Sequence, residues 1–310
     1  MEFKIPRISG EYINVYKPAG GVFPGPSAGQ LKADRHYGKW VANDHCFVKD
    51  GQGRWHVFGI THPESDLENV HAGEYQLFHA LAPKGSLRNV LREGSWKDQP
   101  KVLTANQRQG EMPEIHAPFI VQDNGIYHMI YGPSPLRRAT STNLYDWTPC
   151  GPLANSLVTR DPHLFLLNGV WHVLTCGVAD VRIASLDRFS ACGESRIILT
   201  MKNGVDPESP TLIRHDGTFY LFVCDWNKVW DKKSLQGAYQ HITRVYQSDD
   251  PFNFDVNREI TQIKAHAAEV IREDDSQGDS DLDWFISSVE WPYRGISIVP
   301  LEWCNEPSAE

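Results

Sequence analysis

Three acidic side chains stand immediately before apolar runs that are typical of buried strands. Asp44 lies in "NDHCFV", Asp161 in "TRDPHLF" and Glu208 in "DPESPTLI". Carboxylates crowded into a partly desolvated site repel one another, so some of them titrate far from their usual range, as acid–base chemistry requires. The sequence therefore predicts an acid–base site if these three positions meet in the fold.

Each of these residues also has an ordinary structural explanation. Asp44 follows Asn43 and suits a turn or a strand start. Asp161 can form an ion pair with its neighbour Arg160, and Glu208 can belong to a loop between two prolines. Their shared position before an apolar strand favours the chemical explanation, because convergent ionisable groups mark functional sites.

The elements that would position these side chains recur along the chain. Each copy begins with a polar residue and a short kink, continues as an apolar strand, turns at Gly or Asp, and returns as an aromatic-rich strand. The five copies span residues 43–59, 116–132, 160–177, 208–224 and 266–291. A unit that recurs at about 45 to 75 residues is typical of a repeat architecture.

Each copy is followed by further short strand-like segments, and no segment of useful length has a helical period. The later segments span residues 75–83, 137–150, 181–193, 242–255 and 295–303. These patterns predict an all-β fold: a single five-bladed β-propeller domain over residues 1–310, with four-stranded antiparallel blades around a central channel. We expect the segment before residue 43 to supply a strand that closes the ring with the last blade.

The first strand of each propeller blade lines the central channel, so its first residue opens at one end of that channel. The residues that open the five copies should therefore converge on one small pocket. They are Asn43, Asp44, His116, Arg160, Asp161, Glu208 and His266.

Composition excludes several classes of partner. The formal net charge of −9 argues against a surface that tracks phosphates, so we expect no nucleic acid. No apolar run approaches the roughly 18 residues that span a membrane. The N-terminal stretch lacks a hydrophobic signal region, which predicts a cytoplasmic protein, or a secreted or periplasmic one if the sequence has been trimmed. The oligomeric state stays open.

The six cysteines are scattered and contain no Cys-x-x-Cys pair, so a zinc site has little support. Cys46, Cys176 and Cys224 lie in apolar runs, and we expect them to be buried free thiols.

The motifs resemble those of the furanosidase superfamily of five-bladed propeller glycosidases, which includes glycoside hydrolase families 43, 32, 68 and 117. The segments "AND", "TRDP" and "DPESP" match its Asp, Asp and Glu in order and in strand-start context. The segment "EIHAPFIVQDNGIYHMIY" is similar to the "WAP" blade of family 43, whereas "RDPHLF" is nearer to family 32. Family 32 normally has "NDPNG" where this chain has "NDHCF". The resemblance covers nearly the whole chain and favours a family 43-like enzyme, with families 32 and 117 as alternatives.

The resemblance implies roles for the three carboxyl groups in hydrolysis of a glycosidic bond. Glu208 would be the general acid, with a pKa that crowding raises. Asp44 would be the base that activates water, giving inversion, and Asp161 would orient the acid. In a family 32-like fructosidase, Asp44 would instead be the nucleophile and configuration would be retained.

The remaining candidates concern substrate and metal. Arg160, His116 and Trp226 are expected to bind an oligosaccharide or glycoside of arabinose, xylose or galactose type, in furanoside or pyranoside form. His266 is expected on the channel axis, where it could take part in a hydrated calcium site, although no cofactor is expected to be required. The loops at residues 61–73 and 227–240 would set the sugar preference.

Two other functions stay open: a non-catalytic carbohydrate-binding propeller and a glycoside phosphorylase. The intact Asp, Asp and Glu set argues against the first. The absence of a basic phosphate-binding cluster in the sequence argues against the second.

Overall fold

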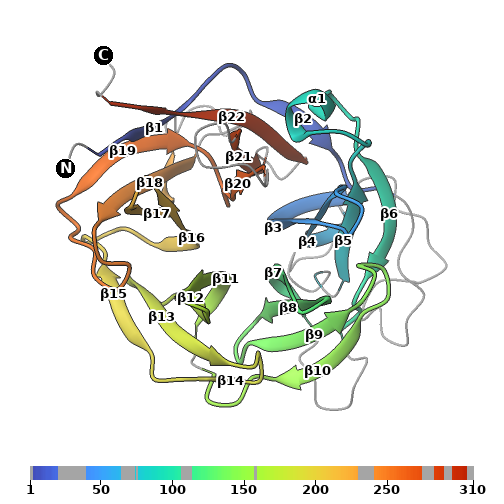
Figure 1. Ribbon diagram of the computed structural model, residues 1–310, viewed down its shortest axis with the longest axis horizontal. Helices are drawn as coiled ribbons and strands as arrows, with labels where there is room; N and C mark the ends of the chain where they lie inside the picture. The colour runs from blue at the N-terminus through green and yellow to red at the C-terminus, as the bar shows by residue number, and fades with distance from the viewer. Residues whose placement is uncertain are drawn as a thin grey trace.

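Five antiparallel sheets stand around one central axis (Figure 1). The computed structural model describes residues 3–19, 40–63, 74, 76–105, 114–156, 159–229, 241–273, 283–289 and 295–305. In the view of Figure 1 the sheets are arranged radially, and the first strand of each lies nearest the axis. The predicted five-bladed all-β propeller is confirmed.

Four blades are built from consecutive strands. Blade 1 contains β3 (Trp40–Lys49), β4 (Trp55–Pro63), β5 (Gln76–Leu81) and β6 (Lys97–Val102). Blade 2 contains β7 (His116–Asp123), β8 (Ile126–Gly132), β9 (Arg137–Ser141) and β10 (Thr148–Pro152). Blade 3 contains β11 (Arg160–Leu167), β12 (Val170–Cys176) and β13 (Asp180–Asp187), which pairs with both β14 (Ala191–Cys192) and β15 (Arg196–Thr200). Blade 4 contains β16 (Pro207–His215), β17 (Thr218–Val229), β18 (His241–Ser248) and β19 (Glu259–Lys264).

The fifth blade joins segments from opposite ends of the sequence. Its inner strands are β20 (Val270–Arg272), β21 (Trp284–Val289) and β22 (Ile296–Cys304). Its outer edge is supplied by β1 (Ile5–Ile8) and β2 (Ile13–Tyr16), which both pair antiparallel with β22. The predicted ring closure by the N-terminal segment is confirmed.

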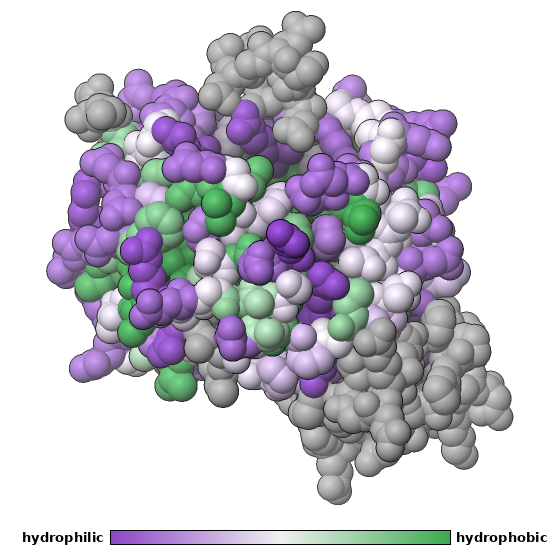
Figure 2. Space-filling model, turned by 60° about the horizontal axis from the view of Figure 1, so that its bottom comes forward, coloured by the Kyte–Doolittle hydropathy of each residue, from purple (hydrophilic) through white to green (hydrophobic). Residues whose placement is uncertain are grey.

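Helix is nearly absent from the described residues. The short α1 (Leu87–Val90) packs between blades 1 and 5, and no helix among the described residues is long and apolar enough to cross a membrane. On the face drawn in Figure 2, hydrophilic side chains predominate and apolar ones lie in groups between them.

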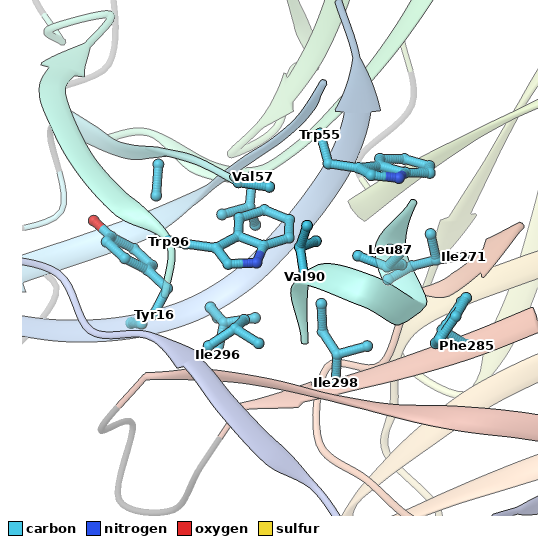
Figure 3. Close-up of a cluster of buried hydrophobic side chains, with 14 of the residues drawn as sticks. Tyr16, Trp55, Val57, Leu87, Val90, Trp96, Ile271, Phe285, Ile296 and Ile298 are labelled. Carbon is cyan, nitrogen blue, oxygen red and sulfur yellow. The ribbon is translucent and has the colours of Figure 1, made fainter. Parts of the chain in front are cut away.

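The hydrophobic core is divided into five clusters, one between each pair of neighbouring blades. The cluster between blades 5 and 1 contains Tyr16, Trp55, Trp96, Phe285 and Ile298 (Figure 3). Burial of apolar area supplies the main stabilising free energy. The blades therefore hold one another in place through these clusters and not through one central core. The buried thiols predicted for Cys46, Cys176 and Cys224 are confirmed: these residues lie in the interior and form no disulfide.

The inner strands of blades 1 to 4 share a β-bulge next to the axis. The two bulged residues are Asn43-Asp44, Ala117-Pro118, Asp161-Pro162 and Ser209-Pro210. Ala117, Asp161 and Ser209 have φ angles of 35°, 57° and 46°, in a region that residues other than Gly seldom adopt. Because a bulge re-aims the side chains of its strand, adjacent residues can both point toward the axis. Functional sites often hold such strained backbone.

The ring closure leads to a prediction about stability. Val15 of β2 is fully buried in the cluster between blades 5 and 1, whereas Val178 is 92% exposed. Val15→Ala should lower the free energy of unfolding by about 2 kcal/mol, because it removes buried methyl groups and leaves a cavity. The same change at Val178 should leave it within about 0.5 kcal/mol of the original value. Denaturant unfolding of both variants measures this, and equal stabilities would contradict a closing role for β2.

Candidate active site

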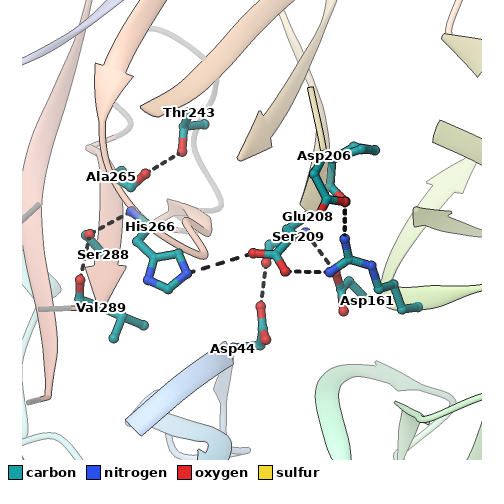
Figure 4. Close-up of polar contacts among 12 residues, drawn as sticks. Asp44, Asp161, Asp206, Glu208, Ser209, Thr243, Ala265, His266, Ser288 and Val289 are labelled. Atoms are coloured by element: carbon teal, nitrogen blue, oxygen red, sulfur yellow. Dashed lines mark hydrogen bonds and ion pairs between the residues drawn. The ribbon is translucent and has the colours of Figure 1, made fainter. Parts of the chain in front are cut away.

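Asp44, Asp161 and Glu208 come from three different blades and meet beside the axis (Figure 4). Ser209 joins them: its hydroxyl donates a hydrogen bond to Asp44 Oδ1, and its backbone N–H donates one to Asp161 Oδ2 over 3.2 Å. The structure thus brings together the three carboxyl groups that the sequence singled out. Their catalytic roles stay predictions.

The bulges explain how three different positions in the repeat reach one point. Glu208 precedes the bulge of its strand, Asp161 is the first bulged residue of its own, and Asp44 is the second. In the sequence, the three residues seemed to share one position, directly before an apolar strand. The register shows instead that they occupy three successive positions, which the bulges turn toward the axis.

Arg160 supplies the positive charge among these carboxyl groups. Its Nη1 donates to Glu208 Oε1 at 2.5 Å and lies 3.5 Å from Asp161 Oδ2. Its Nη2 donates to Asp206 Oδ1 at 2.7 Å and to the carbonyl oxygen of Pro207 at 2.9 Å. The guanidinium is therefore forked between Glu208 and Asp206, as its planar geometry favours.

His266 faces Glu208 from the other side. It lies in a bend just before β20, is 1% exposed, and has its Nε2 3.9 Å from Glu208 Oε2. Its backbone N–H donates to Ser288 Oγ at 2.9 Å, which fixes the bend (Figure 4). The structure thus places His266 next to the carboxyl trio, although it comes from a bend and not from the predicted strand.

The environments of the three carboxyl groups move their pKa values in opposite directions. Burial, followed by the charge of Glu208, raises the pKa of Asp44. Burial and the charge of Asp44 raise the pKa of Asp161 well above its usual range. Burial also acts to raise the pKa of Glu208, but His266 and Arg160 outweigh it and hold this pKa below its usual value. The expectation that crowding raises the pKa of Glu208 is wrong, because these two neighbours favour its carboxylate.

A small cavity lies beside Asp44 and Asp161. A cavity of about 10 Å³, room for a single water molecule, is lined in part by Asp44, His45, Asp161 and Glu269. Glu269 accepts a hydrogen bond from Thr211 Oγ1 at 3.3 Å, and burial raises its pKa. The sequence predicted neither His45 nor Glu269 for the site. His45 directly follows Asp44 in β3, and Glu269 precedes β20 and lies outside that strand.

The described donors near His266 do not suit calcium. Ligand atoms of Glu208, Cys224 and His266 lie within 4.8 Å of one another. Calcium prefers six to eight oxygen ligands, whereas thiol and imidazole groups suit zinc and other transition metals. Burial and the charge of Glu208 also raise the pKa of the Cys224 thiol well above its usual value, which opposes its binding as thiolate.

Of the other predicted binding residues, Trp226 lies near this site, whereas the contacts of His116 are with acidic residues outside the trio. The Trp226 ring stacks on His241 at 4.7 Å and lies 5.2 Å from the ring of His266, which places it on the same side as Glu208. His116 opens the inner strand of blade 2 and has its Nε2 3.1 Å from Glu74 Oε2. Most of the two loops expected to set sugar preference, at residues 64–73 and 230–240, lies outside the described residues.

Solved structures share this fold. A β-xylosidase named RS223 matches with a TM-score of 0.62 and 11% identity, over 85% of this chain and 92% of that one. An exo-1,5-α-L-arabinanase from a bovine ruminal metagenomic library matches with a TM-score of 0.59 and 17% identity, over 85% and 93%. An α-L-arabinofuranosidase from Clostridium thermocellum matches with a TM-score of 0.58 and 16% identity, over 83% and 88%. No protein-family model matches the sequence, and no curated protein does so either. At these identities the similarity shows the fold.

The contact between Ser209 and Asp44 leads to a titration prediction. Ser209→Ala should raise the pKa of Asp44 further, by about one unit, because a hydrogen bond that favours the carboxylate is lost. NMR titration of ¹³C-carboxyl-labelled aspartate measures it, with the Asp44 signal identified by its loss in Asp44→Asn. Ser248 provides a matched control, since it is as buried as Ser209 at 7% exposed and donates to a backbone carbonyl. An unshifted Asp44 signal in Ser209→Ala would show that the hydrogen bond does not stabilise the charge.

The donor set near His266 leads to a prediction about calcium. Because these donors do not suit calcium, we expect calcium to bind weakly. A ligand stabilises the folded state only when its concentration exceeds its dissociation constant, so millimolar calcium should raise the melting temperature by less than about 1 °C. Calorimetry of EDTA-treated protein with and without added calcium checks this. A clear rise with calcium, abolished in His266→Ala, would restore the calcium site.

Proposed function

We propose that this chain is a glycoside hydrolase that cleaves its substrate with inversion of configuration. The observation that carries the proposal is the convergence of Asp44, Asp161 and Glu208 around Ser209 and Arg160. Cleavage of a glycosidic bond needs one carboxyl group as proton donor and a second one as base. The roles given to Glu208 and Asp44 follow from the sequence resemblance, since their resting pKa directions alone would favour the reverse. Fold similarity alone could not support this assignment, since propellers carry many functions.

The proposed reaction uses two of the three carboxyl groups. The protonated Glu208 transfers its proton to the glycosidic oxygen, which departs with the electron pair of the breaking C–O bond. A water molecule attacks the anomeric carbon from the opposite face, and Asp44 accepts the proton that this water releases. Glu208 regains a proton and Asp44 loses one by exchange with solvent, so the net change is the addition of one water molecule.

The neighbours of Glu208 favour the state that exists after proton transfer. Arg160 and His266 stabilise the Glu208 carboxylate, which makes the carboxyl group a stronger acid but leaves less of it protonated at rest. Asp161 remains next to Arg160 and beside both partners, where it can adjust their charges. Trp226 offers a ring surface on the same side as Glu208 for a sugar.

The substrate class that we propose follows from the sequence resemblance and from the names of the similar structures. Those names describe enzymes that act on arabinose and xylose linkages, and one structure from Xanthomonas citri contains xylose. We therefore propose an arabinose-, xylose- or galactose-type glycoside. A family 32-like retaining fructosidase with Asp44 as nucleophile is the second candidate, and the "RDPHLF" segment favours it. NMR analysis of the product anomer separates inversion from retention.

Substitution of the two carboxyl groups tests the assigned roles. Glu208→Gln should reduce turnover of a substrate with a poor leaving group by about 10²- to 10⁴-fold, but should affect an activated aryl glycoside much less, because that leaving group needs no proton. Asp44→Asn should abolish turnover of both, because attack by water fails whatever the leaving group. Steady-state rates of both variants on both substrates measure this.

The results have distinct meanings. Equal losses on both substrates in Glu208→Gln would show that Glu208 is not the general acid. Near-normal rates in Asp44→Asn would show that the carboxyl pair is wrongly assigned. If the unmodified protein turned over no glycoside but bound one, the non-catalytic carbohydrate-binding function would replace this proposal.

A further inference from the structure

Asp206 is placed to act on the proposed proton donor through Arg160. It precedes β16, and its Oδ1 accepts a hydrogen bond from Arg160 Nη2 at 2.7 Å, next to the Nη1 that bonds to Glu208 (Figure 4). The backbone of Asp206 is fixed in position, because its carbonyl oxygen accepts a hydrogen bond from the backbone N–H of Trp226 at 3.1 Å. The side chain is 37% exposed, so it stands at the edge of the site.

The charge on Glu208 changes during the proposed reaction, and Arg160 must accommodate both states. While Glu208 is a carboxylate, Arg160 Nη1 bonds to it at 2.5 Å. When Glu208 is protonated, it no longer offers a full charge to the guanidinium. The folded state loses free energy of stabilisation when a half-buried arginine loses its charged partner, unless another charged group stays in contact with the guanidinium.

We propose that Asp206 is a positioning residue that serves as the constant partner of Arg160, so that Glu208 can take up and release its proton while the guanidinium stays fixed. This inference rests on the proposed hydrolase function. Asp206 neutralises part of the charge of Arg160 and thus weakens its hold on the Glu208 carboxylate. A larger share of Glu208 is then protonated and ready to donate.

Other charged or titratable groups face Glu208 as well, and they remain unchanged in the test. They belong to β3, β11, β12, β17, β18 and the bend before β20, and they are Asp44, Arg160, Asp161, Cys176, Cys224, His241 and His266. The effect of Asp206 must therefore be measured as a difference between variants and not as an absolute value.

Asp206→Asn tests the proposal because it removes the charge and keeps an oxygen that can accept the hydrogen bond. The titration of Glu208 should move to lower pH by about 0.5 to 1 unit, since Arg160 then acts more strongly on its carboxylate. NMR titration of ¹³C-carboxyl-labelled glutamate measures it without any substrate, with the Glu208 signal identified in Glu208→Gln. Turnover of a poor-leaving-group glycoside should fall about threefold or more at neutral pH, while turnover of an activated aryl glycoside changes less.

Asp283→Asn is the matched control. Asp283 is also 37% exposed and binds an arginine, Arg88, at 2.7 Å, but that pair lies beside α1 and away from the trio. This variant should leave the Glu208 titration within about 0.2 unit. Asp206→Glu keeps the negative charge, so the titration of Glu208 in this variant should lie close to that in the unmodified protein.

A double-substitution cycle separates action through Arg160 from direct repulsion between Asp206 and Glu208. If Arg160 transmits the effect, Asp206→Asn should shift Glu208 less than half as far in an Arg160→Gln background. An equal shift in both backgrounds, no shift at all, or a shift to higher pH would overturn the proposal. The proposed hydrolase function is tested separately. It would be contradicted if the unmodified protein cleaved no glycoside, whatever the titration of Glu208 shows.

Discussion

The crowding of carboxyl groups in a buried place is the constraint on which the site depends. Burial raises the cost of ionising Asp44, Asp161 and Glu208, and neighbouring carboxylates raise it further for Asp44 and Asp161. The protein offsets this cost with a guanidinium, an imidazole and a serine. Those compensating contacts all need fixed positions, because charge interactions weaken quickly with distance and solvent access. The propeller provides them by pressing rigid sheets together around one axis, while strained bulges aim the side chains inward.

The same arrangement explains why the chemistry is divided among blades. No single strand could carry three carboxyl groups so close together, since successive side chains of a strand point to opposite faces. Bringing one group from each of three blades avoids this limit. The apolar clusters between blades then determine the geometry of the site.

Much of this structure could be predicted from the sequence, for identifiable reasons. The turns at Gly or Asp predicted the hairpins, as at Asn168-Gly169, and the short kink that begins each copy predicted where its first strand starts. The pKa of Glu208 was predicted wrongly, because its direction depends on distances to Arg160 and His266 that strand patterns do not contain. Asp206 was missed for the same reason: its importance comes from its contact with Arg160 on another blade.

The closure of the ring by β1 and β2 also determines the order in which the blades can fold during synthesis. Ile5 pairs with Cys304 and Ile13 with Ile298, so the fifth blade joins residues from opposite ends of the sequence. During synthesis, blades 1 to 4 can pair as they leave the ribosome, but β1 and β2 have no sheet to join until β22 emerges. Such high contact order slows folding and leaves an unpaired strand edge exposed meanwhile. A nascent chain with that edge uncovered is a natural client for a chaperone.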